Sequence, residues 1–178
     1  MERIGSETAY EGKIIDVRTD TFRYSDGEEA EREIVAHPGA VGIVAHGDGV
    51  VWLVRQPREA VNDSELLEVP AGKLDVEGES HLDCAKRELE EEVGLRAEEW
   101  SEWKRFFTSP GFAEEEVTIF EATGLTEVDD FEPDPEERIE IVKWPLGDLD
   151  GAIEACHDSK SLIALHMLRA LSAAPEGA

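Results

Sequence analysis

One segment changes the period of the apolar residues, and it constrains the fold more than any other. Within residues 80–93, four apolar side chains recur at the spacing of one helical face: Leu82, Ala85, Leu89 and Val93. Gly94 follows at the position where a glycine commonly ends a helix. Alternating or short apolar runs, which are typical of strands, lie on both sides of this segment. Two further helical patterns close the chain, so the order predicts a mixed sheet packed between helices.

The strands are predicted as hairpins in the first half of the chain. The first forty residues alternate as two or three strands, with a turn at the Asp-Gly pair of "SDGEE". The stretch "HPGA" at 37–40 interrupts them, and two apolar strands then meet around Gly47-Asp48-Gly49. After the predicted helix, strands are expected in "EWKRFF", "EVTIFEATGL" and "RIEIVKWPL", followed by one short and one longer helix.

The balance of charge argues against two kinds of partner. The 178 residues carry 43 acidic and 17 basic side chains, which gives a formal net charge of −26 at pH 7. Such a surface repels nucleic acid and anionic membrane, so we expect neither as a partner. The acids are spread along the chain and lysine is scarce. This pattern favours a halophilic protein, whose self-repulsion is screened by a high-salt cytoplasm.

Further sequence features are typical of a cytoplasmic protein. Cys84 and Cys156 lie far apart and fit no metal-binding spacing, so we expect buried, reduced thiols. The first residues contain no apolar segment of a signal peptide. No apolar run approaches the ~18 residues that a membrane-spanning helix needs.

The stretch "RELEEEVGL", residues 87–95, places four glutamates within five positions. On a helical wheel Glu88 and Glu92 are neighbours beside the apolar stripe, with Glu91 next to them. Glu90 lies on the opposite side and is expected to be ordinary acidic surface. Like charges at this spacing repel each other, so either the face is simply solvated or the pair binds a cation. Ligands that are all oxygen favour Mg²⁺ or Mn²⁺.

The wider window "GKLDVEGESHLDCAKRELEEEVGL", residues 72–95, resembles the Nudix hydrolase signature G-x5-E-x7-R-E-U-x-E-E-x-G-U, in which U is aliphatic. Every position matches from Glu79 onward. Six residues rather than five separate Gly72 from Glu79, so the loop before the helix is one residue longer. The loop-then-helix context agrees with the motif. By this resemblance Arg87 and Glu79 orient the helix and the loop by pairing, and we group Arg87 with the catalytic residues.

The resemblance implies a fold and a domain order. The fold is α+β, the α/β/α sandwich of the Nudix family with a mixed sheet, plus a small N-terminal antiparallel β-domain. We expect the β-domain in residues 1–38, the Nudix hydrolase domain in 39–173 and a frayed tail in 174–178. Similar family members are homodimers whose N-terminal domains exchange, so that two subunits build each substrate site.

The resemblance also implies a metal centre with Mg²⁺ as the cofactor and Mn²⁺ as the alternative. Glu88 and Glu92 match the principal metal-binding glutamates of the family. Glu91 matches an auxiliary ligand or a contact of metal-bound water, and we also count it among the catalytic residues. The backbone carbonyl of Ala71 matches a further metal contact. Metals that bridge phosphates neutralise charge and lower the pKa of an attacking water.

The flanking residues choose the subgroup. Pro110 lies fifteen residues after Leu95, which resembles the ADP-ribose pyrophosphatase subgroup, as do "HPGAVGIV", "LVRQPRE" and "LEVPAG". This likeness implies five substrate contacts: Arg58, Arg55, Glu68, Gly111 and Phe112. Arg58 is expected at the phosphates, with Arg55 a weaker candidate. Glu68 is expected on the substrate or metal side, and the last two at the terminal ribose.

The general base and the adenine contact stay open among several residues. Aligning "RIEIV" with the family's late strand favours Glu137 as the base, with Glu136 next. Glu140 and the acids of the Pro110 loop, residues 114–116, remain possible. Three aromatic residues could stack on adenine, although packing is an alternative for each: Tyr10, Phe22 and Tyr24.

Together these features predict a homodimeric, Mg²⁺-dependent hydrolase that cleaves ADP-ribose to AMP and ribose 5-phosphate. One alternative is a Nudix hydrolase of another nucleoside diphosphate derivative, such as a sugar nucleotide or NADH. The other is a non-catalytic, nucleotide-binding regulatory module. The complete set of Glu88, Glu91 and Glu92 argues against a pure binding module, which has no need of all three metal-binding acids.

Overall fold

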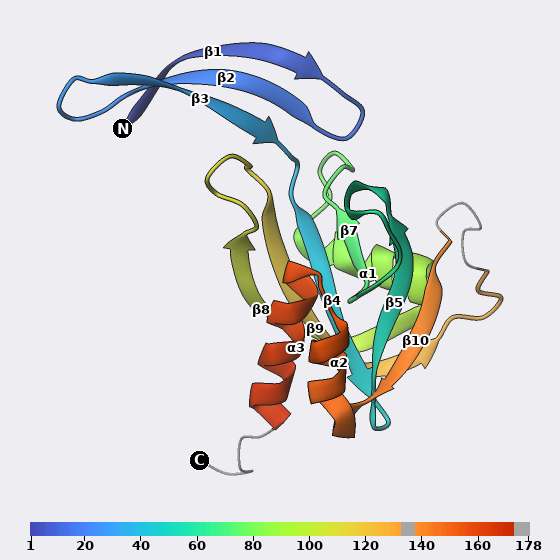
Figure 1. Ribbon diagram of the computed structural model, residues 1–178. Coiled ribbons are helices and arrows are strands. Elements are labelled where there is room, and N and C mark those ends of the chain that lie inside the picture. Colours follow the sequence, from blue (N-terminus) through green and yellow to red (C-terminus); the bar gives the residue numbers. More distant parts are fainter. Residues whose placement is uncertain (133–137, 173–178) are drawn as a thin grey trace. The chain divides into compact units, whose positions relative to one another are not determined.

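The structure is a computed structural model that describes residues 1–132 and 138–172; its helices and strands are drawn in Figure 1. The chain divides into two compact units. The first contains Met1–Gly39 together with Phe106–Val117, and the second contains Ala40–Arg105 and the chain from Thr118 onward. No local pattern in the sequence indicates that residues 106–117 belong with the N-terminal residues.

The first unit is built on an antiparallel sheet of three strands, in the order β1-β2-β3. These strands are β1 (Glu2–Glu11), β2 (Asp16–Arg23) and β3 (Glu29–Ala36). The turn between β2 and β3 contains the Asp-Gly pair, and Gly27 has a φ of +89° that a side chain would strain. The predicted N-terminal β-sheet and its hairpin turn are therefore confirmed.

Segment 106–117 is joined to this sheet by backbone and side-chain bonds. The Val35 N–H donates to the Phe112 carbonyl at 2.7 Å, and the Glu114 N–H donates to the Val35 carbonyl at 3.0 Å. Arg18 donates to both carboxylate oxygens of Glu114. Such contacts between residues distant in sequence depend on tertiary structure, which explains why no local pattern predicted them.

The second unit is built on a mixed sheet in the order β10-β5-β4-β9-β8, with β6 paired to β5 and β7 paired to β4. The bounds are β4 (Ala40–Gly47), β5 (Val50–Arg58), β6 (Asp63–Glu68), β7 (Ala71–Lys73), β8 (Leu95–Phe107), β9 (Glu116–Glu127) and β10 (Glu140–Pro145). Asp48 and Gly49 both have positive φ, 50° and 80°, as a tight hairpin turn requires. The hairpin predicted at Gly-Asp-Gly is confirmed.

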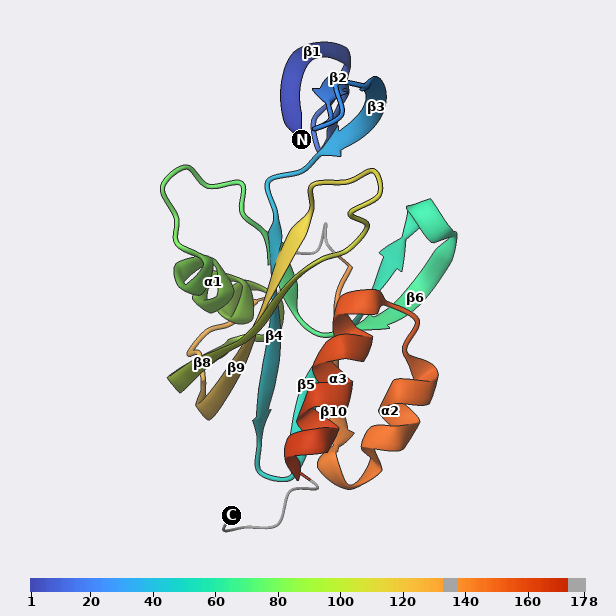
Figure 2. The same cartoon turned by 90° about the vertical axis from the view of Figure 1, so that its left-hand side faces the viewer.

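Three α-helices cover the two faces of this sheet: α1 (His81–Val93), α2 (Leu149–Ala155) and α3 (Ser159–Ser172). Two 3₁₀ turns, Glu59–Val61 and Leu146–Asp148, complete the described elements. Figure 2 shows α1 on one side of β4 and β9, with α2 and α3 on the other. This is the predicted sandwich of helices around a sheet.

The ends of α1 follow from its sequence. The Ser80 side chain accepts a hydrogen bond from the Asp83 N–H at 3.1 Å, which satisfies one of the free donors of the first turn. Gly94 ends the helix with a φ of 69°, and its N–H donates to the Glu90 carbonyl. The predicted boundaries are confirmed, but the buried stripe is rotated, because Cys84 is fully buried while Leu82 is only partly so.

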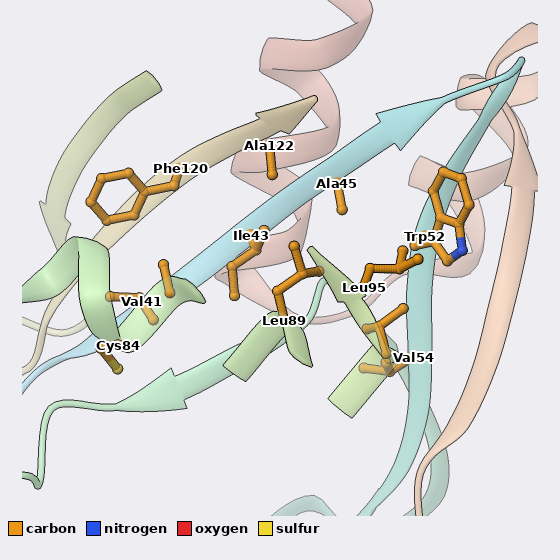
Figure 3. Close-up of a cluster of buried hydrophobic side chains, with 12 residues drawn as sticks. Val41, Ile43, Ala45, Trp52, Val54, Cys84, Leu89, Leu95, Phe120 and Ala122 are labelled. Atoms are coloured by element: carbon orange, nitrogen blue, oxygen red, sulfur yellow. The ribbon is translucent and has the colours of Figure 1, made fainter. Parts of the chain in front are cut away.

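The core under α1 brings that helix onto β4 and β5. Leu89 packs among Val41, Ile43 and Ala45 of β4 and Val54 of β5, as Figure 3 shows. These side chains are all fully buried, so α1 is fixed to the sheet by apolar burial. The rigid contact holds the glutamates on the next helical face beside the short strand β7. No helix among residues 1–132 and 138–172 is long and apolar enough to cross a membrane.

Candidate active site

A cavity of about 390 Å³ opens in the second unit between α1, β7 and the end of β5. Most of the side chains that line it are charged. Its lining residues are Gln56, Arg58, Ala71, Gly72, Lys73, Asp75, Arg87, Glu88, Glu91 and Glu92. The three glutamates of the predicted metal centre and the arginine expected at the phosphates thus share one site.

Glu88 and Glu92 are held against the backbone of β7. Glu92 is only 6% exposed, and its Oε2 accepts a hydrogen bond from the Ala71 N–H at 2.9 Å. Glu88 lies so close to Gly72 that a Cβ there would sit 1.9 Å from the Glu88 Cδ. No other residue type could occupy position 72 without displacing the Glu88 carboxylate, so the glycine and the two acids form one structural unit.

Arg87 pairs with three glutamates at the edge of the cavity, Glu79, Glu88 and Glu91. It donates to both carboxylate oxygens of Glu79, at 2.9 and 3.0 Å. Its Nη1 also donates to Glu88 at 2.7 Å and to Glu91 at 2.9 Å. Hydrogen bonding to Glu79 raises the pKa of Arg87, and the same bonds lower the pKa of Glu79. The expected pairing of Arg87 with Glu79 is present.

The donors of this site fit a hard divalent cation, although they are not gathered into a finished metal site. Among the described residues, no group of three or more acidic, histidine or cysteine side chains is arranged to hold a metal ion. Arg87 instead bridges Glu88 and Glu91. Carboxylate oxygens are nevertheless the ligands that Mg²⁺ prefers. Binding the ion would require Glu88 and Glu91 to turn from Arg87.

Arg58 is fixed by a buried ionic network that the sequence did not reveal. Glu68 is 1% exposed and accepts from Arg58 Nη2 at 2.9 Å and from Lys160 of α3. Lys160 also donates to Asp158 at 3.0 Å. Hydrogen bonding to Glu68 raises the pKa of Arg58. Glu68 therefore lies behind Arg58 and is not among the cavity-lining residues.

Residues at the N-terminus of α3 complete this ionic network. Asp158 Oδ2 accepts from the Ser161 N–H at 2.9 Å and from its hydroxyl at 2.6 Å, and that hydroxyl accepts from the Val69 N–H at 2.8 Å. Burial alone would raise the pKa of Asp158, but Lys160 and Ser161 together lower it. The stretch "HDSKS" could have signalled an N-capping acid, yet its partner Glu68 is 92 residues from Lys160.

Other predicted substrate contacts lie elsewhere. Arg55 is not among the residues that line the cavity, and its Nη1 lies 3.9 Å from Glu140 on the paired strand β10. Gly111 and Phe112 belong to the first unit, where Phe112 is 57% exposed. Their contacts with substrate stay predictions.

None of the described candidates for the general base or the adenine contact lines the cavity that contains Glu88 and Glu92. Glu137 and Glu136 lie outside the described residues. Glu114 is paired with Arg18, which lowers its pKa, and Glu115 accepts from the Thr108 hydroxyl at 2.6 Å. Of the three aromatic candidates, Phe22 lines a second cavity of about 410 Å³ within the first unit. The base and the adenine contact remain predictions.

Comparison with known proteins identifies the class that this fold and site define. The family model described as the NUDIX domain matches residues 35–164. The chain belongs to the Nudix family.

Named relatives extend over most of the chain. An ADP-ribose pyrophosphatase of Bacillus subtilis is 36% identical over 170 residues, covering 93% of this chain and 91% of that protein. An ADP-ribose pyrophosphatase of Mycobacterium tuberculosis is 44% identical over 145 residues, covering 81% and 70%. A solved structure, the crystal structure of an ADP compounds hydrolase, superposes with a TM-score of 0.81 at 25% identity over 96% of this chain and 92% of that one.

Proposed function

We propose that this protein is a Nudix pyrophosphohydrolase that cleaves the diphosphate of ADP-ribose to AMP and ribose 5-phosphate. The observation that carries the proposal is the pair of Glu88 and Glu92 held beside Gly72 in a cavity that Arg58 also lines. Carboxylates that hold a metal and an arginine that meets phosphate are the groups a diphosphate substrate needs. Relatives named for this activity match 81% and 93% of the chain.

We propose Mg²⁺ as the cofactor, with Mn²⁺ as a substitute. Three side chains and one backbone carbonyl would hold it: Glu88, Glu92, Glu91 and Ala71. All are hard oxygen donors, which fit either ion. When bound, the metal neutralises charge on the phosphates and lowers the pKa of a water that attacks them.

The chain's own residues bind and orient the substrate around that centre. Arg58 is held at the cavity wall by Glu68, so its positive charge is placed before a phosphate arrives. Arg87 fixes the register of α1 against Glu79 and positions the metal-binding acids. Arg55, Gly111 and Phe112 are proposed as further contacts to the substrate, and Glu68 supports Arg58.

Glu137 is proposed as the general base that takes the proton of the attacking water. Glu136, Glu140 and the acids at 114–116 are the other candidates, and the pairing of Glu114 with Arg18 makes that residue the least available. Positioned bases contribute about 10²- to 10⁴-fold. A Glu137→Gln variant that loses less than about tenfold in kcat would exclude this assignment.

A homodimer formed through residues 1–38 is proposed from the character of the first sheet. Nearly every residue of β1 is exposed. Several large apolar side chains in and next to β1 are also exposed: Met1, Ile4, Tyr10, Ile14 and Ile15. A sheet of three strands needs an apolar face covered to be stable, and a second copy would cover it. Sedimentation as a monomer would contradict the dimer.

A high-salt cytoplasm is proposed as the working environment. The net charge of −26 is a source of self-repulsion that salt screens. Cys84 and Cys156 are both free and buried, as in a reducing compartment. The thermal midpoint should rise as KCl is added, and a midpoint that stays level or falls would count against the proposal.

The experiment is a substrate panel with the purified protein and Mg²⁺, at low and at high KCl. ADP-ribose, sugar nucleotides and NADH are compared by kcat/KM, with AMP release followed by chromatography. The proposal predicts the highest value for ADP-ribose. A higher value for another nucleotide would select the first alternative, and binding of ADP-ribose without hydrolysis would select the regulatory module.

A further inference from the structure

Gln56 on β5 is a buried polar side chain whose amide nitrogen is unpaired among the described residues. It is 8% exposed, and its Nε2 has no hydrogen-bond partner among the residues that the structure describes. It is the only buried side-chain nitrogen or oxygen in those parts of the chain left in this state. Leaving a buried amide donor unpaired costs about 1–3 kcal/mol, so its presence calls for a ligand.

The position of Gln56 shows where that ligand would lie. Gln56 lines the cavity that also contains Arg58 and Glu88. Its neighbour across the ladder is Leu66, which has no polar side chain to offer. Two residues earlier on β5, Val54 belongs to the core under α1. Side chains alternate along a strand, so Gln56 continues the face of Val54 from the core toward the charged cavity.

The type of residue is also informative. Gln56 is the only glutamine in a chain that contains 43 aspartates and glutamates. A glutamate of the same length at this position would add a negative charge beside Glu88 and Glu92. An amide instead supplies two N–H donors without charge, which suits an anionic ligand whose exposed oxygens only accept.

We propose that the Gln56 amide donates a hydrogen bond to a phosphate oxygen of the nucleoside diphosphate bound in this cavity, beside Arg58. Gln56 is thereby a substrate-binding residue that acts with Arg58 as a hydrogen-bond donor in the cavity that Glu88 and Glu92 also line. The inference rests on the proposed function, because it deepens the description of the same site. It assigns the unpaired donor to the diphosphate and not to the nucleoside.

Two variants separate this role from a structural one. Gln56→Met keeps the length of the side chain and removes its donors, so the buried unsatisfied group disappears. Thr118→Val is the matched control: Thr118 is also fully buried in the second unit, but its hydroxyl is hydrogen-bonded to His81 at 2.8 Å. It lies outside the cavity lining.

The test measures ADP affinity by calorimetry in the presence of Mg²⁺, together with the thermal midpoint of each protein. We expect Gln56→Met to bind ADP ~10- to 100-fold more weakly, as for loss of a hydrogen bond to a charged group, with a midpoint equal to or above that of wild type. Thr118→Val should bind ADP like wild type and melt at a lower temperature.

Two results would overturn the inference. One is ADP affinity of Gln56→Met within twofold of wild type. The other is a midpoint of Gln56→Met that falls as far as that of Thr118→Val, which would make Gln56 a structural residue. Turnover of ADP-ribose by the wild-type protein is measured separately, so that a failure of the proposed activity is not confused with a failure of the Gln56 contact.

Discussion

Two clusters of charged side chains in the second unit, one around Glu68 and one around Arg87, show that buried and cavity-lining glutamates have different roles. Glu68 is 1% exposed and is met by two cationic side chains, Arg58 and Lys160. Glu88 shares the cation Arg87 with both Glu79 and Glu91. Around Glu68 the charges balance, because Arg58 and Lys160 meet two acids, Glu68 and Asp158. Around Arg87 three acids share one cation.

This contrast indicates which acidic cluster of the chain is suited to bind a metal ion. A buried carboxylate with its own cations is satisfied by the fold and lies in the frame of the site. A cluster with more acid than cation, placed against the bare backbone of Gly72, gains from an added divalent ion. In a protein with 43 acidic residues, the number of acids in a segment does not tell a metal-binding carboxylate from a structural one. The partners of each carboxylate in the structure do tell them apart.

The largest effect is expected from Glu92→Gln, which removes a proposed metal ligand and keeps the shape of the side chain. Losing a metal's stabilisation of the transition state is worth several kcal/mol, or about 10³-fold in kcat/KM. Steady-state assays with ADP-ribose and Mg²⁺ measure it. Glu90→Gln is the control, because Glu90 is paired with Arg96 at the surface. Equal activity of Glu92→Gln and wild type would erase the distinction between the two clusters.

The second prediction concerns a variant that disrupts the ionic cluster around Glu68. Lys160→Met removes one of the two cations that meet Glu68, and breaking a buried ion pair typically costs ~3–5 kcal/mol. Because Arg58 still binds Glu68, we expect the free energy of unfolding to fall by about 3 kcal/mol, the lower end of that range. Denaturant unfolding gives the value. Lys143→Met, which removes an exposed lysine, should change stability by less than about 1 kcal/mol, and equal losses in both variants would contradict the account.

Gly72→Ala is expected to lower activity more than it lowers the free energy of unfolding. The new Cβ would meet Cδ and Oε1 of Glu88 at 1.9 and 2.0 Å, and these atoms are the movable end of a side chain. The fold can therefore yield at little cost while the carboxylate is displaced. A misplacement of about 1 Å can cost ~10²-fold in rate. Activity near that of wild type would show that Glu88 need not lie against β7. Gly147→Ala is the control, since a Cβ there meets nothing.

The smallest effect is expected in the acid range. The pKa of Asp158 in the folded protein is lower than its ordinary value of 3.8. The ionised form therefore favours folding, and this contribution is fully present above pH 3.8 and is lost as the pH falls through the folded value. Asp158→Asn should have a shallower loss of stability below pH 3.8 than wild type, measured by denaturant unfolding at several pH values. Parallel curves would show that Asp158 is not stabilised by its partners.

The elements that the sequence predicted well are those fixed by neighbouring residues. The apolar period, Ser80 and Gly94 determine α1, and the Asp-Gly turns determine two hairpins. The glutamates of the site were found because they share one helix, at a spacing that the family signature also has. Arg58 was found from its flanking residues, and the cavity confirms that it lies near those glutamates.

The parts that were missed depend on contacts between distant residues. Lys160 meets Glu68 across 92 positions, and Glu114 meets Arg18 across 96. Neither apolar periodicity nor turn residues in the sequence can predict such long-range pairings. Gln56 was overlooked for a related reason: only the surroundings of its amide show that a donor is buried and unpaired.

The most direct test of the account is Mn²⁺ binding, followed by electron paramagnetic resonance, to wild type, Glu92→Gln and Glu68→Gln. The family resemblance places Glu92 at the metal and Glu68 on the substrate or metal side, and in the structure only Glu92 lines the cavity. We predict that Glu92→Gln loses Mn²⁺ binding and remains stably folded, while Glu68→Gln unfolds at a lower temperature and still binds Mn²⁺ below its midpoint. Wild-type binding by Glu92→Gln, or loss of binding by folded Glu68→Gln, would contradict the central claim.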